Sequence, residues 1–152
     1  MSRRWKLLLV LAAIASTAQF YPVTVRDNPP TSAEIVAPPE IRRILDRSCY
    51  DCHSNETRWP SYSYIAPASW LVAGDVHKAR LRLNLSNWPD SIAPGVDCYF
   101  KRRIAERAEN GEMPPLRYRL LHPSAGLTAE DRVLLAIWAR EECARTSGDA
   151  SK

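Results

Sequence analysis

The sequence has no internal repeat and no low-complexity tract, which excludes a repeat architecture and a largely disordered chain. It also has little net charge. Its formal charge is +4, and removing the three N-terminal cations Arg3, Arg4 and Lys6 from that total leaves +1. So small a charge excludes the electrostatic footprint of a nucleic-acid-binding protein.

Proline and tryptophan, by contrast, are abundant for a chain of 152 residues, which contains 12 prolines and 5 tryptophans. Prolines fix the conformation of loops, and tryptophans cover large flat surfaces. Hydrophobic residues make up 45% of the chain and charged residues 25%, as in globular proteins. The length allows one domain. We therefore expect one compact helical domain wrapped by ordered loops.

Residues 1–25 have the pattern of a secretory leader. Three basic residues precede an apolar run at 7–15, and the small residues at 15–18 could satisfy a signal peptidase. The mostly apolar stretch from Trp5 past Tyr21 is also near the roughly 20 residues that span a bilayer, with an aromatic residue for each interface. The sequence predicts export, and it leaves a cleaved signal peptide and an uncleaved N-terminal membrane anchor both open.

The rest of the chain divides into a linker, a domain and a tail. Residues 26–38 are polar, and Pro29 and Pro30 favour an extended tether. Residues 39–146 form the predicted domain, and residues 147–152 a short tail.

Helical periodicity predicts an all-α domain. The first helix starts at Pro38-Pro39 and places apolar and small residues on one face: Ile41, Ile44, Leu45, Ser48 and Cys52. Further helices are expected at residues 67–80, 96–110 and 128–145, the last opening with a capping pattern at Thr128. Residues 81–85 alternate like a strand, but no second such segment is present to pair with them, so we expect an extended loop.

Cys49, Cys52 and His53 carry the most specific chemistry in the sequence. On a helix these positions share one face, so both sulfurs can add to the vinyl groups of one haem while the imidazole reaches the iron. This spacing is the attachment pattern of c-type haem. A zinc site would need two further ligands at suitable spacing, and a thiol oxidoreductase would place its cysteine pair after a strand. Neither is indicated, so we predict one covalent haem c.

Met113 is the best candidate for the second axial ligand. A thioether is a soft, uncharged ligand that favours ferrous iron and raises the reduction potential. Two prolines directly after Met113 stiffen the loop that would present it, and it is the only methionine besides the initiator. His77 and His122 are the competitors. We expect His77 on a solvated helix face and His122 in a loop.

The chain resembles mono-haem c-type cytochromes in the order of its leader, Cys-x-x-Cys-His, Arg-Trp-Pro and Met-Pro-Pro segments and its capped last helix with Trp138. More closely, residues 48–71 and 111–138 are similar to the bacterial haem-binding domain family of small cytochrome-c-like proteins. The resemblance implies a cytochrome-c-like helical fold, His53 as the proximal ligand and Met113 as its distal partner. Longer segments at 59–85 and 116–126 depart from ordinary small cytochromes.

Arg58, Trp59, Tyr62 and Tyr64 form an aromatic segment after the haem motif. Buried haem propionates need partners for their charge, and this segment supplies guanidinium, indole and hydroxyl donors. We expect some of these four side chains to contact the haem, either as propionate donors or by packing against the porphyrin. The run at 101–103, Lys-Arg-Arg, is expected to form a solvated helix face that could orient an acidic redox partner.

Cys98 and Cys143 are the remaining cysteines, and in an oxidising compartment two spare cysteines usually pair. One lies near the start of the third predicted helix and the other near the end of the last, so antiparallel packing could bring them together. Closing a loop of this length would stabilise the fold by roughly 4 kcal/mol on the chain-entropy model.

These features predict an exported, periplasmic mono-haem cytochrome that transfers single electrons to and from redox partner proteins, with no nucleic-acid partner. With both axial positions filled, the iron could change oxidation state but could not turn over a substrate. The alternatives are a haem-based ligand sensor or small peroxidase-like enzyme with an open distal position, and a haem-free zinc module.

Overall fold

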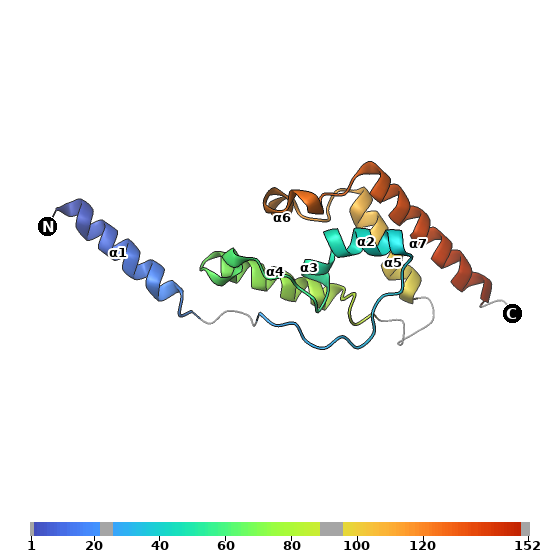
Figure 1. Cartoon of the computed structure of the whole chain (residues 1–152), viewed down its shortest axis with the longest axis horizontal. Coiled ribbons are helices and arrows are strands. Elements are labelled where there is room, and N and C mark those ends of the chain that lie inside the picture. Colours follow the sequence, from blue (N-terminus) through green and yellow to red (C-terminus); the bar gives the residue numbers. More distant parts are fainter. Residues whose placement is uncertain (1, 22–25, 89–95, 150–152) are drawn as a thin grey trace.

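The computed structural model describes residues 2–21, 26–88 and 96–149, and within these parts the regular structure is helical apart from one isolated bridge between Ala33 and Asn87. Figure 1 shows the order of the elements along the chain. They are α1 (Arg3–Ala18), α2 (Pro39–Ser48), α3 (Tyr50–His53), η1 (Ser61–Tyr64), α4 (Ala68–Arg82), α5 (Val96–Glu109), α6 (Leu116–Leu121), η3 (Pro123–Ala125) and α7 (Ala129–Asp149). The predicted all-α class is confirmed.

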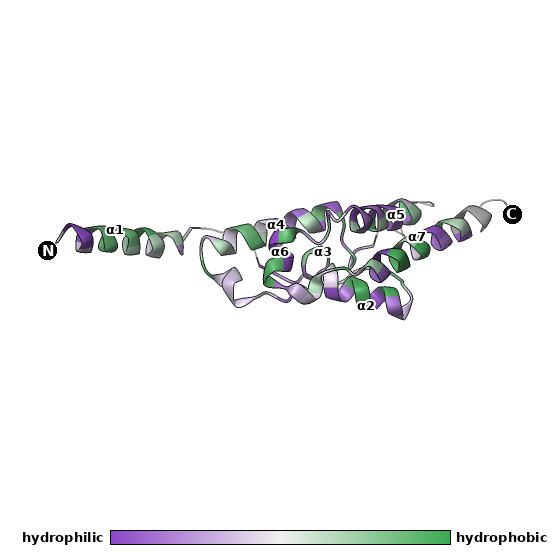
Figure 2. Ribbon diagram, turned by 90° about the horizontal axis from the view of Figure 1, so that it is seen from above, coloured by the Kyte–Doolittle hydropathy of each residue, from purple (hydrophilic) through white to green (hydrophobic). Residues whose placement is uncertain are grey.

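α1 coincides with the predicted leader and lies apart from the other helices (Figure 1). None of its residues is buried, and after its basic first turn the ribbon is mostly hydrophobic (Figure 2). Among the described helices, none combines the length and the apolar character needed to cross a membrane. Residues 22–25 of the predicted leader and residues 150–152 of the predicted tail lie outside the described part.

The first predicted helix is interrupted at Cys49, where the sequence pattern favours a continuous helix. Cys49 has φ −125° and ψ −37°, so α2 ends at Ser48 and the short helix α3 begins at Tyr50. The extended segment after α4 is held against α3, since the Leu85 amide donates to the His53 carbonyl at 2.6 Å. This contact between distant segments explains why local periodicity alone misses the break.

The other predicted boundaries differ from the structure by a few residues, and the short elements η1, α6 and η3 are not predicted. α4 continues to Arg82, so that only the segment from Leu83 onward is extended. α7 runs to Asp149, into the predicted tail. The short helix α6 is not anticipated by any apolar period, because it buries none of its residues.

The core lies where α2, α5 and α7 meet. α2 buries Ile41, Ile44 and Leu45, the stripe that its helical spacing predicts. Leu45 is fully buried, as is Leu135 of α7, and both belong to one apolar cluster. Because α2 leads directly into the Cys49–His53 segment, this packing fixes the position of that segment.

The expected capping pattern is formed at the start of α7. The Thr128 amide donates to the Asp131 carboxylate at 2.8 Å, and the Asp131 amide donates to the Thr128 hydroxyl at 3.1 Å. Arg47 of α2 donates to the same carboxylate at 2.6 Å. The cap therefore also ties α2 to α7.

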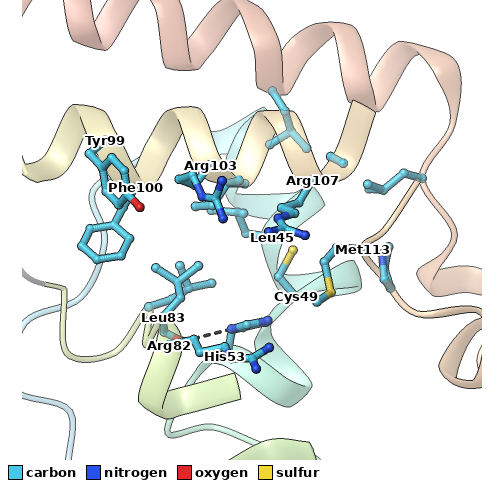
Figure 3. A pocket seen from close by; sticks show the side chains of 16 residues that line it. Leu45, Cys49, His53, Arg82, Leu83, Tyr99, Phe100, Arg103, Arg107 and Met113 are labelled. Atoms are coloured by element: carbon cyan, nitrogen blue, oxygen red, sulfur yellow. Dashed lines mark hydrogen bonds between the residues drawn. The ribbon is translucent and has the colours of Figure 1, made fainter. Parts of the chain in front are cut away.

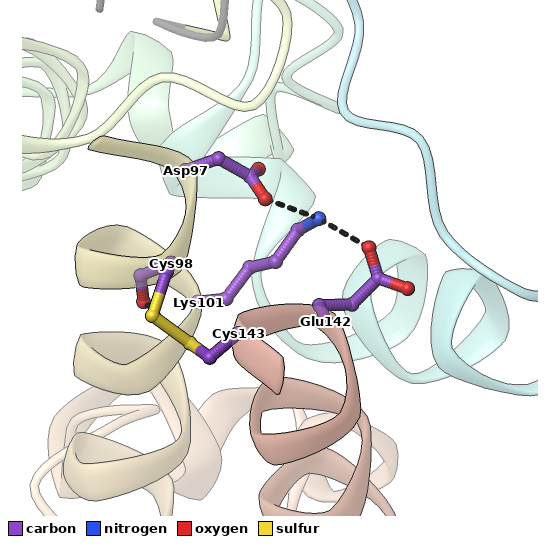
Figure 4. Close-up of a disulfide and its surroundings, with 5 residues drawn as sticks. All are labelled: Asp97, Cys98, Lys101, Glu142 and Cys143. Atoms are coloured by element: carbon purple, nitrogen blue, oxygen red, sulfur yellow. Dashed lines mark hydrogen bonds and ion pairs between the residues drawn. A yellow bond between two sulfur atoms is a disulfide. The ribbon is translucent and has the colours of Figure 1, made fainter. Parts of the chain in front are cut away.

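A disulfide and a buried cation join α5 to α7 (Figure 4). The disulfide links Cys98 to Cys143, the pair for which the sequence favours a bond. The ammonium group of Lys101 lies 2.7 Å from the Asp97 carboxylate and 2.9 Å from that of Glu142. Lys101 is only 4% exposed, so it is not part of a solvated face, and that expectation for the 101–103 run is wrong at this position.

Replacing Lys101 is expected to destabilise the domain strongly. The variant Lys101→Met should lower the free energy of unfolding by about 3 kcal/mol, because it removes a buried cation that contacts the largely buried carboxylates of Asp97 and Glu142. Urea unfolding of the oxidised protein measures this change. Arg102→Met, at the exposed neighbouring position, is the control and should stay within about 0.5 kcal/mol of the parent. Equal stability of the two variants would contradict the assigned role of Lys101.

Candidate functional site

A cavity of about 360 Å³ lies between α2, the end of α4, α5 and α7. This volume falls within the range of small-molecule and cofactor sites. Its wall is mainly apolar: Leu45, Leu83, Leu85, Tyr99, Phe100, Ile104, Ala108, Pro114, Leu127 and Leu135. Cys49, His53 and Met113 also line it, and Figure 3 shows their side chains together at one end, with Tyr99 and Phe100 at the other.

His53 presents one defined nitrogen to this cavity. Its Nδ1 atom lies 3.0 Å from the Leu83 carbonyl oxygen, which can only accept, so Nδ1 carries the proton (Figure 3). Nε2 is therefore the unprotonated nitrogen. Burial lowers the pKa of His53, which keeps the ring neutral at pH 7. A neutral imidazole with its second nitrogen held by a carbonyl is the form that ligates metals.

Cys49 and Cys52 are both free thiols, whereas the other two cysteines form the disulfide. Burial raises the pKa of Cys49 to about 12 and that of Cys52 to about 11, so both are protonated at pH 7. Cys49 lines the cavity, and Cys52 is not among the lining residues. The structure therefore brings one of the two predicted attachment residues, Cys49, to the cavity wall, and the other, Cys52, lies three residues further along the chain.

Met113 reaches the cavity from the loop that follows α5. Gly111 ends the helix with φ +69°, a conformation that glycine adopts without steric cost. The amides of Glu112 and Met113 both donate to the Arg107 carbonyl, at 3.1 and 3.2 Å. Pro114 is buried on the cavity wall. The Met113 side chain is 37% exposed, so it faces the cavity and also touches solvent.

Three arginines that were not among the predicted site residues line the cavity. They are Arg82 at the end of α4 and Arg103 and Arg107 on α5. Arg107 forms an ion pair with Glu112, and Arg103 lies 3.7 Å from Glu106. The two α5 arginines are one turn apart, on the helix face that also carries Phe100 and Ile104. That shared face is the signal in the sequence that could have revealed them.

The predicted donors Arg58, Trp59, Tyr62 and Tyr64 are not among the residues that line the cavity. Arg58 is held by Asp51, with its Nε 2.8 Å from the carboxylate. Tyr64 is exposed and lies under the guanidinium of Arg26. The expectation that this segment supplies the contacts to a group in the cavity therefore receives no support, because a carboxylate seven residues away captures Arg58.

The two competing histidines also lie elsewhere. His77 is exposed on α4, as expected. His122 stacks on Tyr118, with ring centroids 4.3 Å apart, and its Nε2 lies 3.5 Å from the Tyr62 hydroxyl. Neither lines the cavity. Of the three histidines, the structure brings only His53 to the site.

The donor set fits a haem better than a bare metal ion. Within the described residues, no three or more His, Cys, Asp or Glu side chains are grouped so as to hold a metal ion. The cavity instead combines an apolar wall, one neutral imidazole, one thioether, a free thiol and three guanidinium groups. A porphyrin needs an apolar enclosure, ligands for its iron and partners for its carboxylates, and the lining contains side chains of each of these types.

Comparison with known proteins identifies the family. A model of the haem-binding domain family matches residues 8–141, which include the whole cavity, so the chain belongs to this family. The resemblance noted from the sequence is confirmed at this level. No curated protein and no solved structure matches the chain.

Proposed function

We propose that this member of the haem-binding domain family is an exported mono-haem c-type cytochrome that transfers single electrons. The observation that carries the proposal is the meeting of three elements at one cavity: the Cys49–His53 segment, the Met113 loop and the apolar wall from α5 and α7. A haem bound there supplies a one-electron iron couple, and the protein's part is to hold and insulate it.

Each residue of the site has a distinct part in this proposal. Cys49 and Cys52 hold the porphyrin through thioether bonds, and the free state of both thiols beside an oxidised cysteine pair supports that assignment. His53 would bind the iron through Nε2, because Nδ1 is committed to Leu83. Met113 would supply the second protein ligand. The thioether favours ferrous iron and so sets a higher reduction potential than an oxygen or second imidazole ligand would.

The haem propionates are proposed to pair with the arginines of the cavity rather than with Arg58. Arg82 and Arg103 face the cavity from α4 and α5 respectively, and Arg107 lies one turn beyond Arg103. A buried carboxylate needs a charged or hydrogen-bonding partner, and guanidinium groups bind carboxylates in a two-pronged geometry.

The site of action is proposed to be the periplasm, reached through the N-terminal segment. A disulfide elsewhere in the same chain suits an oxidising compartment. The apolar α1, preceded by Ser2 and opened by Arg3 and Arg4, supports export, either with cleavage or with retention at the membrane. Redox partner proteins would then be met at the membrane surface or in the periplasm.

An absorption spectrum of the protein matured in a haem-attaching host tests this function. We expect a low-spin ferric spectrum with a sulfur-to-iron band near the red end, and slow binding of carbon monoxide to the reduced protein. Rapid carbon monoxide binding by the reduced protein, without that band in the ferric form, would instead favour a ligand-binding or peroxidase-like role with an open iron position.

A further inference from the structure

The loop that carries Met113 leads directly into a helix with almost no hydrophobic anchorage. α6 begins three residues after Met113, and none of its residues is buried. Leu116, Leu120 and Leu121 are each more than 60% exposed. Since apolar burial is the usual source of helix docking energy, α6 must be held mainly by polar contacts.

One of these contacts is short and partly buried. The Tyr118 hydroxyl donates to the Asp51 carboxylate at 2.6 Å. The Asp51 side chain is only 15% exposed, and Arg58 donates to both of its carboxylate oxygens. Hydrogen bonds to a charged acceptor are about twice as strong as neutral ones, and removal of water strengthens them further.

The other polar link between α6 and the body of the domain is weaker. Arg117 lies 2.9 Å from Asp75 of α4, but the two side chains are 70% and 39% exposed. Ion pairs at this degree of exposure contribute little to stability. The Tyr118–Asp51 hydrogen bond is therefore the strongest described tie between α6 and the segment that carries the attachment motif.

This hydrogen bond joins the two sides of the cavity by a short path. Asp51 lies between Cys49 and Cys52 and two residues before His53, while Tyr118 lies five residues after Met113. Pro114 and Pro115 lie between Met113 and α6, and each fixes its own φ, so the connection has little slack. A displacement of α6 is thus transmitted to Met113.

We propose that Tyr118 and Asp51 form a latch that holds the Met113 loop over the cavity, with Tyr118 acting as a positioning residue for the distal ligand. The inference rests on the proposed function, in which Met113 binds the haem iron. Without the latch, a larger fraction of the molecules has Met113 displaced from the iron. In these molecules the iron can bind an external ligand. The expected factor is on the order of tenfold, as for the loss of one hydrogen bond to a carboxylate.

The test compares two conservative variants of the haem-loaded full chain. Tyr118→Phe removes the hydroxyl and keeps the ring that stacks on His122. Tyr64→Phe makes the same change at an exposed tyrosine of η1 and is the control. The measurements are the rate of carbon monoxide binding to the reduced protein and the intensity of the sulfur-to-iron band. We expect Tyr118→Phe to bind carbon monoxide about tenfold faster, with a weakened band, and Tyr64→Phe to match the parent.

Three further variants separate the latch from a general loss of stability. Asp51→Ala removes the acceptor and should reproduce the faster binding, and the double variant with Tyr118→Phe should be no faster than either single variant, since both remove the same bond. Arg117→Ala loosens α6 at the exposed ion pair only and should leave the rate near that of the parent.

The outcomes keep the latch and the proposed function apart. If the parent protein shows the sulfur-to-iron band but Tyr118→Phe and Asp51→Ala bind carbon monoxide at the parent rate, the latch is refuted and the function stands. If the parent protein lacks the band and binds carbon monoxide rapidly, ligation by Met113 is refuted, and the latch falls with it.

Discussion

Met113→Ala is expected to lower the reduction potential on the order of 0.1 V and to open the iron to external ligands. A thioether stabilises ferrous iron, and axial ligands set haem potentials over a range of about 0.8 V, so its loss shifts the couple toward the ferric form. Met113 is the one thioether on the cavity wall. A redox titration gives the potential, and carbon monoxide binding to the reduced variant shows whether the iron has opened.

Leu116→Ala is the matched control for that experiment. Leu116 lies three residues further along the same segment, is 64% exposed and is not among the cavity residues. It should leave both the potential and the carbon monoxide rate unchanged. If Met113→Ala keeps the parent potential, Met113 is not the distal ligand. That result would not affect the description of the fold.

Cys52→Ala is expected to retain its haem poorly. The double variant Cys49→Ala/Cys52→Ala should hold no haem that survives denaturation. Each sulfur contributes one covalent bond to the haem, and haem that lacks such a bond is lost when the chain unfolds. Haem staining of a denaturing gel, normalised to the amount of protein, measures the effect. The single variant should stain weakly compared with the parent.

The second cysteine pair provides the control for this result. Cys98→Ala/Cys143→Ala removes the disulfide, which joins α5 to α7 outside the cavity, and it should stain like the parent. Full staining of Cys52→Ala would show that the second sulfur is not needed. If the disulfide variant lost its haem stain and Cys52→Ala stained like the parent, the assignment of haem attachment to Cys49 and Cys52 would be wrong.

The structural features that the sequence predicts well depend on short-range patterns. Cys49, Cys52 and His53 are recognised from their spacing alone, and the Thr128–Asp131 cap from two polar residues three apart. The stripe on α2 follows from helical periodicity. In each case the interacting groups lie within about one or two turns of each other, where backbone geometry determines the contact.

The structural features that the sequence does not predict depend on residues distant in the chain. Lys101 resembles a surface cation in the sequence, and only the approach of Glu142, 41 residues away, identifies it as buried. Arg82 and Arg103 come from different helices, and only the fold brings them to the wall of the same cavity. The short helix α3 that follows the break at Cys49 contacts the segment after α4, whose Leu83 and Leu85 form hydrogen bonds with His53.

The aromatic segment after the attachment motif shows a different limit. Its guanidinium, indole and hydroxyl groups are the kinds of donor that a propionate needs. The kind of donor does not determine which acceptor it binds in the folded protein. Arg58 instead donates to Asp51 within the same local structure, and Tyr118, from a helix that the sequence does not reveal, donates to the same carboxylate. The Tyr118–Asp51 contact is the proposed latch.

The intact mass of the protein, purified from a host that attaches haem to exported proteins, tests the central claim most directly. We expect a mature chain heavier than its polypeptide by one haem, with Cys49 and Cys52 resistant to thiol-alkylating reagents after denaturation. A mass equal to that of the polypeptide alone, with both of these cysteines open to alkylation, would contradict it.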